Sequence, residues 1–410
     1  MAPSTLGQLI LGYQCVWNPA RQAAALQLFL LPREGEMLDA PHFLRALDQT
    51  WTGQSLTPVL TPLDAHLLAE LLRHCPADGP WLSVQQELLA DDGMRALLRS
   101  AHQRGVTLLW RGAAGQRPDP DSASLFARCI ITLTPGETLA GAQAALRQGG
   151  AGGGAQPGIG PIEAGQIVEA VPSRLLADHC LDQAGAWGLA GWPVDDVLLS
   201  HRQQPVAPSH RAIVRLLRET DADVALEQLE HTLAEEPLLA YRFLRYTNSA
   251  AVGLRSGVES LRHGLMLLGL TRFKQWLMEQ MPQADNEPDM DPVRTAIVLR
   301  AHLMEHLLDA GEEDQLRREV FLTGVLSQID GLLGEPLRDA LTRLPLSERV
   351  NSAILGASGP YAPFLELATA FEYPRMPSIP ALCRQHELAL DDVNRTLLRV
   401  LAQVRRSARA

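Results

Sequence analysis

Hydrophobic runs alternate with amphipathic segments along the first half of the chain. Residues 79–85 and 106–110 are short and apolar, as buried strands are, whereas residues 90–105 carry apolar side chains at helical spacing and end at a glycine. The same alternation continues to about residue 205. Because strands that alternate with helices pair in parallel, with the helices outside the sheet, this half predicts an α/β barrel or an open α/β sheet.

After this first half the pattern is that of helices alone. Ser209 is placed to cap the first of them, and Pro237 fits the first turn of another, where its missing N–H breaks no hydrogen bond. The segment 201–209, which contains two prolines, marks the change. The sequence therefore predicts an α/β domain over residues 1–205 and an all-α domain over residues 206–410.

A glycine-rich segment interrupts the first half. Residues 149–160 contain seven glycines. A phosphate-binding loop would end in Gly-Lys followed by Ser or Thr and would follow a strand, and this segment has neither feature. We therefore expect a flexible insertion.

The bulk composition is that of an acidic globular protein. Hydrophobic residues make up 46% and charged residues 20% of the 410 residues, and the net charge is −11. This charge argues against a nucleic-acid partner. The chain has no apolar run near the roughly 18 residues that span a bilayer, and its first residues lack the basic region of a signal peptide. We expect a cytoplasmic protein without a membrane segment.

The cysteines agree with that compartment. Their number is odd, they lie far apart, and they form no C-x-x-C pair. Reduced thiols are expected, and neither a disulfide framework nor a zinc knuckle.

The segment 247–269 has the features of a helix–loop–helix corner. Asn248 follows one helix, in a position where asparagine tolerates the left-handed conformation. Gly253 allows a compact turn, and Ser256 with Glu259 forms an S-x-x-E capping box for the next helix. Gly269 ends that helix. These roles serve backbone geometry and include no catalytic group.

Residues 235–270 also resemble an HDOD domain, the output-type relative of the HD phosphohydrolases. The resemblance is carried by Asn248 and Ser249 and by three residues that follow them, Gly253, Ser256 and Gly269. It extends loosely over residues 210–400. It implies an all-helical domain that presents a surface to another protein.

With that resemblance in view, the first half resembles an EAL domain, the fold of cyclic di-GMP phosphodiesterases. Residues 11–30, 81–110 and 167–194 carry this second resemblance. It implies an eroded (β/α) barrel that is shorter than a complete one. The predicted fold is therefore an α/β EAL-type barrel followed by an all-α HDOD domain.

An EAL enzyme holds two metal ions with carboxylates and an asparagine, and the positions of these ligands in the resemblance carry other residues. They are Leu26 or Gln27, Ser83, Arg111, Gly112 and Pro172. Glu169 remains as an acid on an expected strand, and an arginine near a dicationic site repels metal ions. We expect no catalytic residue, no metal and no other cofactor in this half.

The second half gives the same result. The metal helix of an HD enzyme carries adjacent His and Asp, and this chain has Ser327 and Gln328 there, with Asp330 nearby. HDOD domains in general lack the full set of HD ligands. The expectation for the whole chain is that it is not an enzyme.

The residues from His302 to His306 read H-x-x-E-H, the inverted zincin motif. Two histidines four positions apart on a helix can bind zinc, and Glu366 or Glu372 would supply a third ligand. The alternative is a chance match, in which both histidines flank the apolar stripe of an ordinary helix. We favour the chance match and expect no metal site.

These observations predict an inactive bacterial signalling protein that regulates through protein–protein contacts. One alternative is a receptor that binds cyclic di-GMP without hydrolysing it, for which Trp110, Arg111 and Trp187 are the candidates near strand ends. Another is a metal-dependent phosphohydrolase. Arg255 and Arg262 are the candidates for the partner-binding surface, because the corner requires no cation there.

Overall fold

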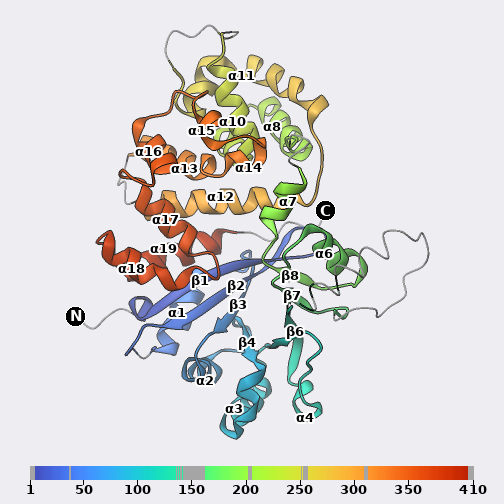
Figure 1. Cartoon of the computed structure of the whole chain (residues 1–410). Coiled ribbons are helices and arrows are strands. Elements are labelled where there is room, and N and C mark those ends of the chain that lie inside the picture. Colours follow the sequence, from blue (N-terminus) through green and yellow to red (C-terminus); the bar gives the residue numbers. More distant parts are fainter. Residues whose placement is uncertain are drawn as a thin grey trace. The chain divides into compact units, whose positions relative to one another are not determined.

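The computed structural model describes two compact units. Its described residues are 5–36, 38–134, 136, 138, 141, 162–201, 206–250, 252, 257–308 and 313–404. The barrel unit comprises Met1–Asp196 and Ala370–Ala410, and the helical unit comprises Val197–Thr369 (Figure 1). The glycine-rich residues 149–160 lie outside the described residues, so their predicted flexibility stays a prediction.

Eight strands close the barrel in chain order. They are β1 (Leu9–Trp17), β2 (Ala23–Pro32), β3 (Thr57–Pro62), β4 (Trp81–Gln85), β5 (Leu108–Ala113), β6 (Phe126–Thr132), β7 (Ile167–Glu169) and β8 (Gly188–Ala190). Strands β2 to β8 are parallel, and β1 is antiparallel to both of its neighbours. The fold class predicted from the sequence is confirmed. The barrel is closed, although the resemblance implied one that is shorter than a complete barrel.

The helices that connect the strands are short. Between β5 and β6 the chain forms only the four-residue helix α4 (Pro120–Ala123). The other helices of this part are α1 (Ala40–Thr50), α2 (Ala65–His74), α3 (Asp92–Gln103), α6 (Arg174–Asp178) and α7 (Val194–Ser200), with single turns η1 (Thr5–Gln8), η2 (Gln86–Ala90) and η3 (His179–Gln183). Aspartates cap the three longest, which satisfies backbone N–H groups at their first turns.

The inside of the barrel is built in layers, because side chains alternate between the two faces of a strand. One layer is apolar and buried: Val16, Ala25, Val59, Leu109, Ile130, Ile167 and Ala190, with Trp81 and Trp187 packed against it. Two residues further along five of these strands come the polar side chains Gln27, Thr61, Arg111, Thr132 and Glu169. We call these five residues the polar layer.

The C-terminal segment packs on the barrel. Figure 1 shows η5 (Met376–Ser378), α18 (Ile379–Gln385) and α19 (Leu390–Gln403) in red beside the blue strand β1. Backbone bonds join Tyr13 to Phe371 and Tyr373, and the buried Asn394 amide donates to the carbonyls of Leu6 and Leu9 at 2.8 Å each. Contacts thus assign residues 370–404 to the barrel unit, whereas the sequence placed them with the second domain.

The helical unit contains α8 (His210–Asp221), α9 (Leu226–Ala234), α10 (Pro237–Thr247), α11 (Leu261–Gln280), η4 (Met281–Gln283), α12 (Met290–Leu307), α13 (Asp314–Leu326), α14 (Ile329–Leu333), α15 (Leu337–Leu341), α16 (Glu348–Gly356) and most of α17 (Ala362–Ala370). Ser209 caps α8, as predicted, since its Oγ accepts from the N–H of Ala212 at 3.3 Å. Gly324 lets α13 approach α12 closely, because a Cβ there would lie 2.5 Å from Ala301 Cα.

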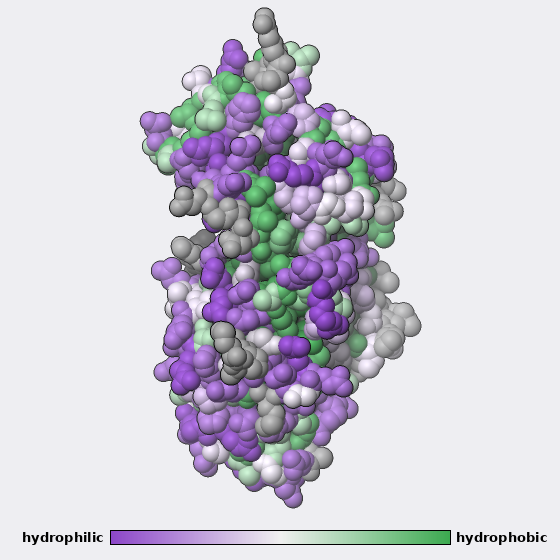
Figure 2. Space-filling view, turned by 90° about the vertical axis from the view of Figure 1, so that its left-hand side faces the viewer, coloured by the Kyte–Doolittle hydropathy of each residue, from purple (hydrophilic) through white to green (hydrophobic). Residues whose placement is uncertain are grey.

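The face of the molecule seen in Figure 2 is mainly polar. Figure 2 shows hydrophilic residues over most of the viewed face, with hydrophobic residues exposed between them. Within the described residues, the helices are all too short or too polar to cross a membrane.

Candidate functional site

The polar layer of the barrel is organised around one carboxylate. Glu169 ends β7 and is only 3% exposed. Its Oε1 accepts from Nε2 of Gln27 at 2.8 Å, and its Oε2 accepts from Nε of Arg111 at 2.9 Å and from Oγ1 of Thr132 at 3.0 Å. A second guanidinium nitrogen of Arg111 also lies 2.9 Å from this oxygen. Both carboxylate oxygens are therefore engaged.

The remaining contacts of Gln27 link this cluster across the barrel. Its Nε2 also donates to Oγ1 of Thr61 at 3.0 Å, and its Oε1 accepts from Nε2 of Gln14 at 2.9 Å. The strands β1, β2, β3 and β7 are thus joined through a single amide side chain. Such a network holds its members in fixed positions, because each buried group keeps a partner.

Arg111 stays charged inside the barrel. Burial by itself would lower the pKa of its guanidinium, but the charge and the hydrogen bond of Glu169, together with Tyr373, outweigh burial and raise it. The centre of the guanidinium lies 6.0 Å from the ring of Phe29, and Tyr373 stacks on that ring with centroids 3.7 Å apart. This aromatic pair, one ring from β2 and one from the C-terminal segment, lies next to the arginine.

The resemblance to EAL domains implies a pair of metal ions, and the polar layer does not fit them. Gln27 and Ser83 offer an amide and a hydroxyl, and Arg111 offers a cation. The carboxylate of Glu169 is already neutralised by that cation. Two divalent ions require several anionic oxygen ligands, which these side chains do not provide.

The three residues proposed for a nucleotide site do not come together. Trp110 is fully buried, and its Nε1 donates to Gln86 at 2.5 Å. Trp187 precedes β8, packs against Trp81 at 5.9 Å between centroids and carries the guanidinium of Arg128 at 4.7 Å. Arg111 lies further along its strand, in the polar layer. The structure therefore gives no support to a site built from these three residues.

In the helical unit, Asn248 joins the end of α10 to the chain that leads into α11. Its Nδ2 donates to the carbonyls of Leu244 and Val258 at 2.8 and 2.9 Å, and its Oδ1 accepts from the N–H of Val258 at 2.8 Å. Ser249 Oγ donates to the carbonyl of Tyr246 at 2.7 Å. Asn248 has φ −92° and ψ 4°, so the predicted left-handed conformation is wrong. The hydrogen bonds of its side chain, and not a left-handed backbone conformation, connect the two sides of the corner.

The start of α11 also differs from the prediction. The helix begins at Leu261, and its cap is Ser260, whose Oγ accepts from the N–H of His263 at 3.2 Å. Glu259 precedes this cap, so it does not complete a capping box with Ser256. Gly253, Arg255 and Ser256 lie outside the described residues. Gly269 interrupts α11 with φ 73°, which confirms its predicted role as a helix breaker.

Arg262, the described member of the predicted partner surface, is 28% exposed and already paired. Its guanidinium contacts Glu227 at 2.6 Å and Glu230 at 3.7 Å, both on α9. Burial raises the pKa of Glu230, although Arg318 and Arg262 oppose that shift. The pairing connects the first turn of α11 with α9.

The two positions of the HD ligands complete a helix junction. Ser327 ends α13, and its Oγ donates to the carbonyl of Gly324 at 2.7 Å. Gln328 precedes α14 directly.

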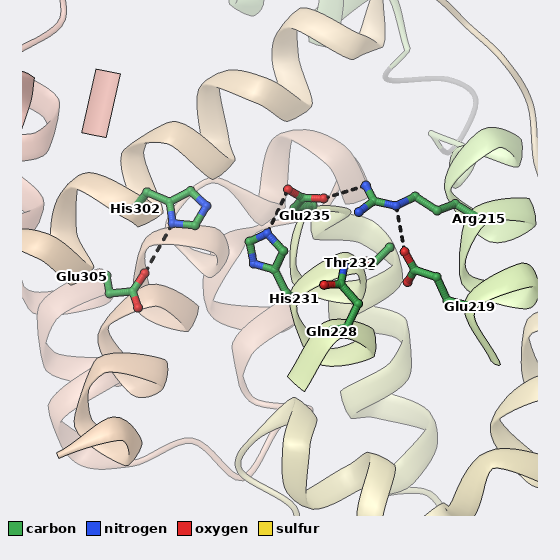
Figure 3. A network of polar contacts seen from close by, with 8 residues as sticks. All are labelled: Arg215, Glu219, Gln228, His231, Thr232, Glu235, His302 and Glu305. Carbon is green, nitrogen blue, oxygen red and sulfur yellow. Dashed lines mark hydrogen bonds and ion pairs between the residues drawn. The ribbon is translucent and has the colours of Figure 1, made fainter. Parts of the chain in front are cut away.

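A cavity of about 710 Å³ opens in the helical unit, and charged side chains line it. They include Glu230, His231, Arg262, His302, Glu305 and Arg318. Figure 3 shows His231 between Glu235 and His302. His231 contacts Glu235 at 3.3 Å, and Arg215 joins Glu235 to Glu219 at 3.0 Å each.

This network fixes the charge of its members. The hydrogen bond to Glu235 raises the pKa of His231, although burial opposes it. Burial of Glu235 opposes its ionisation, but His231 and Arg215 outweigh burial and lower its pKa. The H-x-x-E-H motif lies beside this network, since the rings of His231 and His302 are 6.1 Å apart.

Comparison with known proteins now identifies the second part of the chain. The family model described as the HDOD domain matches residues 205–334. The chain contains an HDOD domain. Its first half, a closed barrel of eight strands, resembles an EAL domain.

Three relatives illustrate these similarities. Cyclic di-GMP phosphodiesterase CdgJ of Vibrio cholerae serotype O1 is 23% identical over 198 residues, which cover 48% of this chain and 46% of CdgJ. The MmoQ response regulator of Methylococcus capsulatus is 20% identical, with a TM-score of 0.40, over 47% of this chain and 98% of that one. The EAL domain of Mycobacterium smegmatis DcpA is 12% identical, with a TM-score of 0.29, over 45% and 90%.

The comparison with CdgJ overturns the expectation that the chain is not an enzyme. That expectation rested on placing single ligand positions by resemblance, and the matched relative is itself named a phosphodiesterase. The matched region spans about half the length of that relative. The misfit between the polar layer and two metal ions concerns this layer alone. It does not exclude an enzymatic activity of the chain.

Proposed function

We propose that this chain is a regulatory protein of cyclic di-GMP signalling that binds a protein partner through its HDOD domain. The observation that carries the proposal is the combination of an EAL-like barrel with an HDOD domain in one chain. The similarity to CdgJ, which is named for its action on cyclic di-GMP, supports the same signalling context.

The first turns of α11 offer the binding surface. Arg262 and Met266 both line the cavity, and they are four positions apart, so they lie on one face of the helix. Met266 is 57% exposed, which is unusual for a large apolar side chain next to a charged cavity. An exposed methionine beside an arginine is typical of protein interfaces.

The ion pairs of Arg262 are compatible with this role. Glu227, its nearer partner, is largely exposed. An exposed ion pair contributes little to stability, so Arg262 can exchange Glu227 for a carboxylate of a partner at small cost. Arg255, whose structure is not described, remains a second candidate for the same surface.

Charge and polarity reversal tests the surface. The full chain and an Arg262→Glu, Met266→Glu variant serve as baits in extracts of the source bacterium, and Met278→Glu is the matched control. Met278 is on the same helix and 58% exposed, but it does not line the cavity. We expect the wild type and the control to retain the same specific partner, and the double variant to lose it. Equal capture by all three refutes the proposal.

A second candidate function is action on cyclic di-GMP itself, which the name of CdgJ favours. The full chain is incubated with cyclic di-GMP and magnesium or manganese, and the linear product is measured. If the barrel carries this activity, Glu169→Gln should abolish it, since Glu169 is the carboxylate of the polar layer. Activity that survives Glu169→Gln excludes the polar layer as its source.

A further inference from the structure

Three side chains that can ligate a metal ion lie together at the end of α12. His302, Glu305 and His306 are three and four positions apart, so the helix places them on one face. Oε2 of Glu305 lies 3.3 Å from Nδ1 of His302 and 4.0 Å from Nδ1 of His306. One ligand atom from each residue fits within 4.8 Å of the others.

We propose that His302, Glu305 and His306 bind one divalent transition-metal ion, with its open coordination positions toward the cavity of the helical unit. His302 and Glu305 line that cavity, so water or a small anion can reach an ion held there. The sequence alone favoured a chance match and looked for a third ligand at Glu366 or Glu372. The geometry supplies the third ligand from Glu305, inside the motif.

The ligand types select the class of metal. Two imidazoles and one carboxylate suit zinc and related ions, which three protein ligands hold with one position left open. Magnesium and calcium prefer oxygen ligands throughout, so they should bind this site poorly. The 3.3 Å between Oε2 of Glu305 and Nδ1 of His302 is a separation that two ligand atoms of one ion have. One ligand atom of His306 lies within 4.8 Å of the other two, so a small side-chain rotation brings it to the ion.

The surroundings hold the ligands in place. The ring of His302 packs against Phe321 of α13 with centroids 4.8 Å apart. The close approach of α12 and α13 at Gly324 keeps these helices together on this side. Nδ1 of His306 lies 2.9 Å from the carbonyl of His302, a contact that leaves its Nε2 available as a ligand. Rigid positioning of this kind is what a metal site requires.

The cysteines are weak competitors for the same ion. Burial raises the pKa of Cys15, Cys75 and Cys180 to about 12. A thiol binds a metal ion as the thiolate, so these groups are poor ligands near neutral pH. Metal binding to the intact folded chain should therefore report on the histidine site.

Titration of the chelator-treated full chain with cobalt(II) tests the proposal. The visible absorption of cobalt reports its coordination, and zinc(II) is then added in competition. We expect one equivalent to bind, without the intense near-ultraviolet band of thiolate ligation. His302→Gln and His306→Gln should weaken binding by at least about tenfold, the lower limit seen when even an outer partner of a ligand is lost.

A matched control separates the site from the cavity in general. His263 lines the same cavity but is not part of the three-residue group. His263→Gln should bind the metal as the wild type does, and circular dichroism checks that each variant is folded. The proposal is overturned if the wild type shows no saturable binding up to about 1 mM, the weak end of useful affinity. It is equally overturned if folded His302→Gln and His306→Gln variants bind as tightly as the wild type.

Discussion

Removal of the buried cation is the sharpest test of the polar layer. In Arg111→Met, a flexible apolar side chain replaces the guanidinium, and the carboxylate of Glu169 stays in the barrel without its counter-charge. Gln27 and Thr132 still donate to that carboxylate. The substitution therefore removes the charge pairing and keeps the hydrogen bonds from Gln27 and Thr132 to Glu169.

The expected loss of stability is large. Breaking a buried ion pair from one side costs about 3–5 kcal/mol, because the remaining charge is left uncompensated. For a unit the size of the barrel unit, this corresponds to a fall in melting temperature of roughly 6–20 °C. Arg111→Met combined with Glu169→Gln should lose clearly less, since no buried charge remains, the amide oxygen can still accept from Gln27, and its NH2 group can donate to Oγ1 of Thr132.

Tryptophan fluorescence during urea unfolding measures the stability of the barrel unit. Six of the seven tryptophans belong to the barrel unit, and only Trp276 lies in the helical unit. Arg99→Met, on the exposed face of α3, is the control for loss of an arginine and should change stability by less than about 0.5 kcal/mol.

Two results would refute the reasoning. If Arg111→Met costs no more than Arg99→Met, the pair is effectively solvated and contributes nothing to the barrel. If the double variant is less stable than Arg111→Met, hydrogen bonding by the ionised carboxylate, and not charge pairing, dominates the polar layer.

Two further predictions concern the helical unit. Asn248→Ala removes three hydrogen bonds to Leu244 and Val258 and should cost about 1–3 kcal/mol, measured by circular dichroism melting. A melting temperature equal to that of the wild type would show that Asn248 does not build the corner. The pair of His231 and Glu235 should stabilise the fold most at mildly acidic pH. The pKa of His231 is raised, so its contribution is full below the unfolded value and is lost as pH rises through the folded value. The pKa of Glu235 is lowered, so its contribution is present above the unfolded value and is lost as pH falls through the folded value. In His231→Gln the loss of stability as pH rises through the folded pKa of His231 should be absent, whereas Arg215 still supports the ionised form of Glu235 at low pH. An unchanged profile contradicts the assignment.

Local sequence patterns predicted most of the elements but not how the chain ends pack. The alternation of apolar runs and amphipathic helices in the first half predicts strand–helix units, because its period is local, but it leaves a barrel and an open sheet as alternatives. The resemblance to EAL domains favours the barrel. The return of the C-terminal segment to β1 was not visible. An amphipathic helix such as α19 shows which face is buried, but the pattern does not say against which domain.

The same limit applies to the candidate sites. Strand periodicity places Arg111 and Glu169 on the inside of a barrel, but their pairing joins residues 58 positions apart. No local pattern indicates that Arg262 pairs with Glu227, which lies 35 positions earlier. The S-x-x-E pattern of Ser256 and Glu259 favours Ser256 over Ser260, although Ser260 caps α11. The H-x-x-E-H motif points to Glu366 or Glu372 as the third ligand, and it does not show that Glu305 lies beside both histidines.

The surroundings of the two arginines decide what each can do. The partner of Arg111 is a buried carboxylate that also accepts from an amide and a hydroxyl, so exchanging it would leave several groups unsatisfied. The nearer partner of Arg262 is an exposed carboxylate, and salt screens such a pair. A partner protein or an anion can therefore compete for Arg262 but not for Arg111. This contrast supports a structural role for the polar layer, and it supports our proposal that charge recognition belongs to the cavity of the helical unit, beside Met266 and the histidine cluster of α12.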